Sequence, residues 1–270
     1  MSKTLKLQAK VTGKGIPLLL VPGGLTGWNS WEPFVDSFVE MQRKVIRVQL
    51  LNVEYGFDGR QLPADYSVKT ESMALDATLK ALGHYTPIDI VAWSFGAFVS
   101  LDYALDHPEN IHTLTLIEPP AIWILRNDGE LDAQTQKSIS FLGSLQGNIT
   151  DDMLAAFLSE IGLAGQGQSV RDLPQWRQWL PYKQSLRCNP VIITHNDELK
   201  RLQAIKSPVL LIKGTGSALF LHKIIKGLGS NLPDSETVEF PEGHAPHIVS
   251  RDRFLQEWEK FQNNHSAAAA

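Results

Sequence analysis

The sequence predicts an α/β protein with a mostly parallel central sheet, helices on both faces of that sheet and a helical insertion. Short, nearly continuous apolar runs occur at residues 16–21, 88–93 and 208–212, as in strands that are buried on both faces. Amphipathic helical patterns separate these runs, and alternating strands and helices favour a parallel sheet. The long stretch 119–205 contains no convincing strand, so it is expected to be a helical insertion between two strands.

The strands are expected where apolar residues run together or alternate. Residues 5–11 alternate and predict an edge strand. The strand at 16–21 has to end at Pro22-Gly23-Gly24, because proline and glycine interrupt regular structure. The full set of expected strands is 5–11, 16–21, 45–51, 88–93, 111–117, 208–212 and 236–240.

The helices are expected where apolar residues recur on one face. Asn29 or Ser30 is expected to cap a helix that runs to about Gln42, since both residue types are favoured at helix N-termini. Residues 52–63, which include two glycines, are expected to form a loop. The other expected helices are 67–82, 97–105, 219–228 and 253–261.

The insertion divides the chain into two parts. We expect residues 1–118 and 206–264 to form the α/β core and residues 119–205 to form a helical cap. A segment of this length is too long for a bare loop, and open α/β sheets bind their ligands at the carboxyl ends of the strands. The cap is therefore expected to cover that edge. Residues 265–270 are interpreted as an added or frayed tail outside the core.

Composition and charge restrict the partners. The formal net charge is −4, whereas nucleic-acid binding usually needs a basic face, so we expect no nucleic-acid partner. The single cysteine, Cys188, excludes an internal disulfide and is expected to be an unreactive, semi-buried or surface thiol. No stretch reaches the roughly 18 apolar residues of a membrane span, and the first ten residues carry no apolar leader. These features predict a cytoplasmic protein of undetermined oligomeric state.

Ser94 is the candidate nucleophile. It lies in Ala92-Trp93-Ser94-Phe95-Gly96, between an expected strand and an expected helix. A sharp strand-to-helix turn needs small residues two positions before and after its exposed serine, as in the nucleophile elbow. The positive end of the helix also favours developing negative charge. The alternative is that Ser94 only caps the helix.

His244 is the candidate general base. A serine hydroxyl needs a base to remove its proton, and His244 follows the last expected strand, on the same rim as Ser94. His247 is the rival, but Gly243 gives His244 a backbone suited to close approach. Five other histidines are expected to be surface or solvated groups: His84, His107 and His112 near the opposite rim, and His195 and His222 on helices.

Glu118 is the candidate acid that orients the histidine. The turn after the strand at 208–212 contains no carboxylate, whereas Glu118 ends the strand next to that of Ser94. Two prolines then fix the backbone after Glu118. The alternative is a carboxylate that only anchors the cap at the rim.

Two backbone amides are candidate oxyanion donors. The N–H of Phe95 follows the nucleophile and opens the helix, and the second donor is expected at Gly24 or Leu25, after the strand at 16–21. The alternative is that Pro22-Gly23-Gly24 is a simple turn.

Together these motifs resemble the α/β-hydrolase superfamily over nearly the whole chain outside the cap. The order Ser94, Glu118, His244 matches the serine, acid and histidine order of that family. Three residues depart from its pattern: Pro22 stands where histidine is usual, Ala92 replaces the first elbow glycine, and Ser217 occupies the usual position of the acid. Some members take the acid from the strand that ends at the position of Glu118, and the resemblance implies that role here.

The resemblance implies a serine hydrolase that cleaves an ester-like bond of a small, partly apolar substrate without cofactor or metal. The serine at position 94 argues against the epoxide hydrolase and haloalkane dehalogenase branches, which need a carboxylate nucleophile. Two alternatives stay open. One is a cofactor-free C–C hydrolase or perhydrolase with the same three residues, and the other is a ligand-binding or sensor protein on a hydrolase scaffold.

Overall fold

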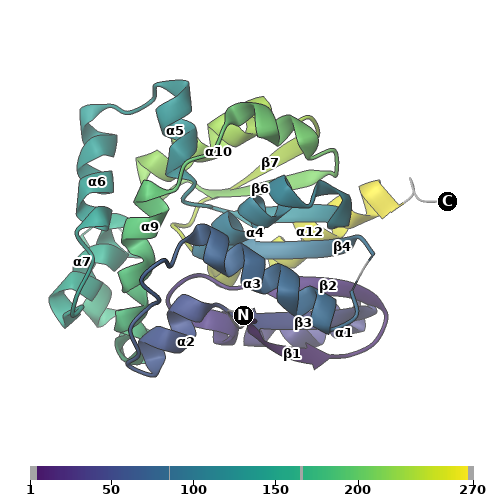
Figure 1. Ribbon diagram of the computed structural model, residues 1–270, viewed down its shortest axis with the longest axis horizontal. Coiled ribbons are helices and arrows are strands. Elements are labelled where there is room, and N and C mark those ends of the chain that lie inside the picture. The colour runs from purple at the N-terminus through teal and green to yellow at the C-terminus, as the bar shows by residue number, and fades with distance from the viewer. Residues whose placement is uncertain (1–4, 85, 165–166, 267–270) are drawn as a thin grey trace.

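A computed structural model describes residues 5–84, 86–164 and 167–266. These residues contain one seven-stranded sheet in the order β1-β3-β2-β4-β5-β6-β7 (Figure 1). β1 pairs antiparallel with β3, and the other neighbours pair in parallel. The predicted fold class is therefore confirmed. The strands are β1 Gln8–Thr12, β2 Ile16–Val21, β3 Arg43–Gln49, β4 Ile88–Trp93, β5 Ile111–Ile117, β6 Val209–Gly214 and β7 Ser235–Phe240.

Helices cover both faces of the sheet. Alternate residues of the central strands enter separate cores: Leu19 and Ile90 pack into one, and Leu20 and Val91 pack into the other. This alternation follows from the two-residue period of a strand, and burial on both faces explains the continuous apolar runs. The first core is covered by α3 Val68–Ala81, α4 Phe95–Asp106 and α10 Leu219–Asn231, and the second by α1 Val35–Glu40 and α12 Arg251–Ser266.

The helix expected at 29–42 is two elements. The 3-10 helix η1 spans Gly27–Phe34 and contains Pro33, which lacks the N–H that a continuous α-helix needs, and α1 follows directly. Neither expected cap is used, because the N-cap is Thr26 and the Ser30 hydroxyl donates to the Gly27 carbonyl.

The expectation of a loop at 52–63 is wrong in its first half, where α2 spans Leu51–Phe57. The buried carboxylate of Glu71, on α3, accepts the backbone N–H groups of Leu51 and Asn52 at 2.9 and 2.8 Å. A partner nineteen or twenty residues away thus satisfies the first turn of the helix.

The described part of the segment between β5 and β6 is helical and contains no strand. Figure 1 shows α5, α6, α7 and α9 together at one end of the sheet. The helical cap expected at 119–205 stays a prediction for this segment. Its elements are α5 Ile122–Asp128, α6 Ala133–Gly143, α7 Asp151–Glu160, η3 Val170–Asp172, α8 Trp176–Trp179, η4 Leu180–Cys188, α9 Asn189–Thr194 and η5 Leu199–Ala204.

The remaining elements are two short helices and the end of the C-terminal helix. The elements η2 Pro108–Asn110 and α11 Pro246–Val249 precede β5 and α12. Residues 265 and 266, assigned to a tail from the sequence, continue α12, and 267–270 lie outside the described residues. Within the described chain, every helix is too short or too polar to cross a membrane.

Candidate active site

Ser94 occupies a sharp turn between β4 and α4. Its φ and ψ are 54° and −123°, a conformation that non-glycine residues rarely adopt. The turn is closely packed, because a Cβ on Gly96 would lie 2.1 Å from the Pro22 carbonyl oxygen. The Ser94 side chain makes no capping hydrogen bond to α4, so its hydroxyl is free for another partner.

That partner is His244, which lies in the loop after β7. The two side chains approach to 2.8 Å between Ser94 Oγ and His244 Nε2. The other ring nitrogen, Nδ1, lies 2.7 Å from Glu118 Oε2. A carboxylate only accepts hydrogen bonds, so Nδ1 carries the proton and Nε2 accepts the serine O–H.

The backbone of His244 is held from two sides. Its N–H donates to the Gly162 carbonyl in the insertion at 3.3 Å, and its carbonyl accepts from Trp93 Nε1 at 2.8 Å. The approach to the insertion is tight, since a Cβ on Gly243 would lie 1.8 Å from the Gly162 oxygen. Glycine before the histidine therefore permits a contact that no other residue could make, as expected from the sequence.

Glu118 is fully buried at the end of β5, with φ at 47°. Its second oxygen, Oε1, accepts the Gly214 N–H at 2.8 Å and the Ser217 hydroxyl at 2.5 Å. The residue at the usual acid position of the family thus donates to the carboxylate supplied by the neighbouring strand. With His244, the carboxylate therefore has three hydrogen-bond partners, which fix its orientation.

His247, the rival histidine, lies elsewhere. It is fully buried, and its ring stands 5.0 Å from that of Trp31 and 4.9 Å from that of Trp93. Neither ring nitrogen has a hydrogen-bond partner among the described residues. Burial, and secondarily the nearby His244, lowers the pKa of His247 well below its ordinary value. This histidine is therefore a neutral group of the aromatic core.

The other histidines differ in part from expectation. His195 is not solvated: its side chain is 11% exposed and lies 3.5 Å from buried Asp102, because the end of the insertion folds back onto α4. His222 is half-buried against the Gly214 carbonyl. His84, His107 and His112 are half-buried rather than free surface groups, and His112 contacts Asp89.

The candidate oxyanion donors lie beside Ser94. Phe95 is the first residue of α4, so its N–H has no acceptor within the helix. Gly24 approaches Phe95 so closely that an added Cβ would lie 3.2 Å from the Phe95 Cβ. Gly24, Leu25 and Phe95 line one cavity with Ser94 and His244.

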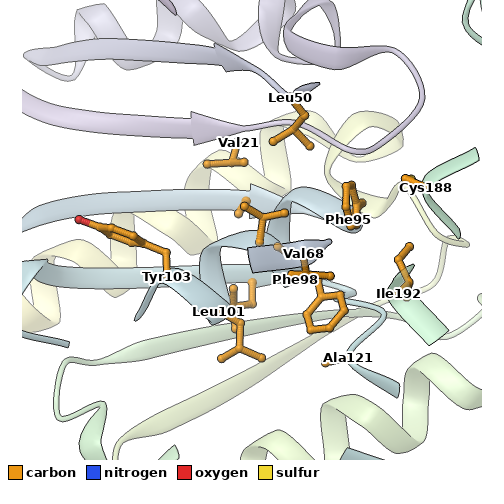
Figure 2. Close-up of a cluster of buried hydrophobic side chains, with 14 of the residues drawn as sticks. Val21, Leu50, Val68, Phe95, Phe98, Leu101, Tyr103, Ala121, Cys188 and Ile192 are labelled. Atoms are coloured by element: carbon orange, nitrogen blue, oxygen red, sulfur yellow. The ribbon is translucent and has the colours of Figure 1, made fainter. Parts of the chain in front are cut away.

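This cavity has a volume of about 540 Å³. It lies between the carboxyl ends of the strands and the helical insertion, and its lining contains no Asp, Glu, Lys or Arg among the described residues. Cys188 belongs to this lining and is 2% exposed, and burial raises the pKa of its thiol. Figure 2 shows Phe95 from α4 opposite Cys188 and Ile192 from the insertion. The apolar members from the insertion are Leu142, Phe157, Leu158, Ile161, Leu163, Leu173, Trp179, Leu186 and Ile192.

Two residues that support the candidate site are not predicted by the sequence. Ser217 is identified there only as the residue at the usual position of the acid. Its hydrogen bond to Glu118 depends on the end of β6 lying beside β5. Asn52 was placed in a loop, yet its amide reaches the Gly24 carbonyl at 2.8 Å. Neither contact has a local sequence signal.

The comparisons with known proteins define the class. Residues 16–250 match the model of the alpha/beta hydrolase fold family. Because this match spans most of the chain, the protein belongs to that family, and the expectation of an α/β-hydrolase enzyme is confirmed.

Individual relatives are distant. The chain is 23% identical over 256 residues to a pimeloyl-[acyl-carrier protein] methyl ester esterase of Nitrosomonas europaea, covering 92% of this chain and 96% of the relative. It is 32% identical over 124 residues to a 2-hydroxy-6-oxo-2,4-heptadienoate hydrolase of Pseudomonas putida, covering 45% and 43%. An esterase structure from Exiguobacterium antarcticum superposes with a TM-score of 0.75 at 18% identity over 94% of each chain.

Proposed function

We propose that this protein is a serine hydrolase that cleaves an ester-like bond through an acyl-enzyme on Ser94. The observation that carries the proposal is the continuous hydrogen-bonded chain from Ser94 Oγ through His244 to Glu118, at 2.8 and 2.7 Å. The wall of an uncharged cavity contains both Ser94 and His244. A nucleophile within reach of a base, with the base held by a third group, is the arrangement that nucleophilic acyl transfer requires.

The first half of the reaction forms the acyl-enzyme. Ser94 Oγ attacks the carbonyl carbon and passes its proton to Nε2 of His244, while the carbonyl π electrons move onto oxygen. Glu118 stabilises the resulting imidazolium. The backbone amides of Phe95 and Gly24, or Leu25, donate to the oxyanion. When the tetrahedral intermediate collapses, the ester C–O bond breaks and the leaving alkoxide takes the proton from His244.

The second half releases the product. Water attacks the acyl carbon and gives a proton to His244, and the new tetrahedral intermediate expels Ser94, which regains its proton from His244. The acid product then leaves. In the first half His244 passes the Ser94 proton to the leaving group, and in the second it passes a proton from water back to Ser94 across the 2.8 Å contact.

We further propose that residues 119–205 act as a cap that binds the acyl part of the substrate. The insertion supplies most of the apolar lining and, through Gly162, holds the backbone of His244. A charged group on the acyl part of the substrate would lose its water and find no counter-ion in this lining. The site therefore favours an uncharged, apolar acyl group.

The uncharged lining of the cavity favours ester hydrolysis over the C–C hydrolase alternative. A dienoate substrate, such as the one in the name of the Pseudomonas putida relative, is a carboxylate. The described lining of the cavity offers no Lys or Arg to pair with it. Neutral esters fit the cavity better than anionic diketones.

The test is hydrolysis of p-nitrophenyl esters from acetate to decanoate by the wild type and by Ser94→Ala, with a neutral β-diketone as a second substrate class. Ser30→Ala is the matched control, since Ser30 lines the same cavity without contacting His244. We expect Ser94→Ala to lose at least about 10³-fold in kcat and Ser30→Ala to keep its rate within a few-fold. A wild type as inert as Ser94→Ala on every ester would overturn the proposal.

A further inference from the structure

The amide of Asn52 connects three parts of the active site region. Asn52 is 1% exposed, in the first turn of α2. Its Nδ2 donates to the carbonyl of Gly24 at 2.8 Å, to the carbonyl of Ser185 at 3.1 Å and to Cys188 Sγ at 3.3 Å. The first acceptor belongs to the loop after β2, and the other two belong to η4 of the insertion.

The orientation of this amide is determined by its surroundings. Three acceptors surround one atom, so that atom has to be the NH₂ group rather than the oxygen. The Asn52 Oδ1 atom is buried and has no hydrogen-bond partner among the described residues. Leaving a buried polar atom unpaired costs about 1–3 kcal/mol, which offsets part of the stability that the donor contacts of the same amide contribute.

Asn52 is itself held firmly in place. The Glu71 carboxylate accepts the Asn52 N–H at 2.8 Å, the Leu51 N–H at 2.9 Å and the Tyr66 hydroxyl at 2.6 Å. Glu71 and Tyr66 are both buried. The start of α2 is therefore fixed to α3, and Asn52 offers its NH₂ group from a rigid base.

The hydrogen bond to Gly24 determines the direction of a backbone amide. Peptide bonds are planar, and the described chain contains no cis peptide. In a trans peptide the C=O and the following N–H point in opposite directions. Fixing the Gly24 carbonyl therefore also fixes the N–H of Leu25, and it limits the rotation of Gly24, which has no side chain to restrict it.

We propose that Asn52 is a positioning residue that holds the loop of Gly24 and Leu25 so that its backbone N–H groups meet the oxyanion. Asn52 does not line the cavity, whereas Gly24, Leu25 and Phe95 do. It therefore acts through the loop and touches no substrate. Because the same amide binds Ser185 and Cys188, the loop is also tied to the position of the insertion. This inference rests on the proposed serine hydrolase function.

The test separates positioning from folding and from substrate binding. Asn52→Ala removes the amide, and Asn52→Asp keeps the shape but presents oxygen to two carbonyls. Because a directly contacting oxyanion donor is worth about 10²–10³-fold in kcat, we expect both variants to lose about 10–100-fold in kcat, with KM within threefold. The Ki of a boronic acid, which mimics the tetrahedral intermediate, should rise by the same factor as kcat/KM falls.

The control is Asn127→Ala, which removes an exposed amide bound to the carbonyls of Trp123 and Asp197, away from the cavity. Its kcat should stay within twofold. A folded Asn52→Ala with near-wild-type kcat, or a loss confined to KM, would overturn the inference, as would a boronic acid Ki that does not follow kcat/KM. If Asn52→Ala does not fold, the isosteric Asn52→Asp decides by the same readouts. A wild type that hydrolyses no ester would instead contradict the proposed function, and with it this inference.

Discussion

Ser217 donates a 2.5 Å hydrogen bond to Glu118. The sequence resemblance makes this pairing informative, because Ser217 stands where the family usually has its acid. In this chain the carboxylate comes from the end of β5, and the turn after β6 contributes a hydroxyl and the Gly214 N–H to support it. The side chain at position 217 thus supports the carboxylate that contacts His244.

Glu118→Gln should abolish most of the activity. The amide keeps the size of the carboxylate but cannot stabilise an imidazolium, and its NH₂ group favours the wrong tautomer of His244. Loss of the corresponding group in a serine triad costs about 10⁴-fold, so we expect a 10³–10⁴-fold fall in kcat. Steady-state ester hydrolysis measures it. A variant with near-full rate would contradict the assignment of Glu118.

Ser217 variants should rank by the charge that they place beside Glu118. Ser217→Ala leaves the Gly214 N–H in place, so we expect about a threefold to tenfold loss of kcat, which corresponds to about 0.7–1.4 kcal/mol, the range of one ordinary hydrogen bond. Ser217→Asp places a second carboxylate within hydrogen-bonding distance of Glu118, where two like charges repel each other, and should be slower than Ser217→Ala. Equal rates for the two variants would show that Glu118 and Ser217 are not coupled.

His247→Phe should keep the activity and remove a source of acid sensitivity. In the unfolded chain this histidine takes up a proton near pH 6.5, whereas burial keeps it neutral in the fold. The folded state thus binds fewer protons, and stability is lost as the pH falls below about 6.5. Urea unfolding at pH 5 and pH 8 should show a smaller acid loss for His247→Phe than for the wild type. A large fall in kcat would restore His247 as a candidate base.

Glu71→Gln should change how stability depends on pH. Burial raises the pKa of Glu71 from 4.5 to about 7, against the donors Tyr66, Leu51 and Asn52, which lower it. The folded state therefore binds more protons than the unfolded state between these values, so stability falls as the pH rises through this window. At about 1.4 kcal/mol per pH unit, the loss over the window from 4.5 to about 7 is at most about 3.5 kcal/mol. The free energy of unfolding should fall less between pH 5 and pH 8 in Glu71→Gln than in the wild type, and parallel curves would refute this.

Ile192→Phe should shorten the acyl chain that the enzyme accepts. Ile192 lines the cavity and is 5% exposed, so a larger side chain fills space that a long acyl group needs. We expect kcat/KM for p-nitrophenyl decanoate to fall at least tenfold, while that for the acetate changes little. Ile193→Phe, the neighbouring position outside the lining, is the control. Equal effects on both esters would argue against acyl binding under the insertion.

Local patterns predicted the core elements well. The apolar runs marked β2, β4 and β6, because strands buried on both faces need nearly every residue to be apolar. The same patterns failed where a distant residue decides the local structure. The helix α2 depends on Glu71, and the burial of His195 depends on the return of the insertion onto α4.

In the candidate site, too, some features follow from local sequence and others depend on distant residues. Ser94, Glu118 and His244 each end or follow a parallel strand, and carboxyl ends of parallel strands share one rim, so their meeting was predictable. The contact of Ser217 depends on the register between β5 and β6, and the contact of Asn52 depends on the position of α2 after β3. No short window of sequence contains that information.

The most direct test of the account is the mass of the protein during turnover of a slowly deacylating ester, with the modified peptide sequenced. We expect a covalent adduct with the mass of the acyl group, located on Ser94 and absent from Ser94→Ala, which forms and decays at rates that match steady-state hydrolysis. Full ester hydrolysis without any adduct on Ser94, or an adduct on another residue with the same kinetics, would contradict the proposed acyl-enzyme.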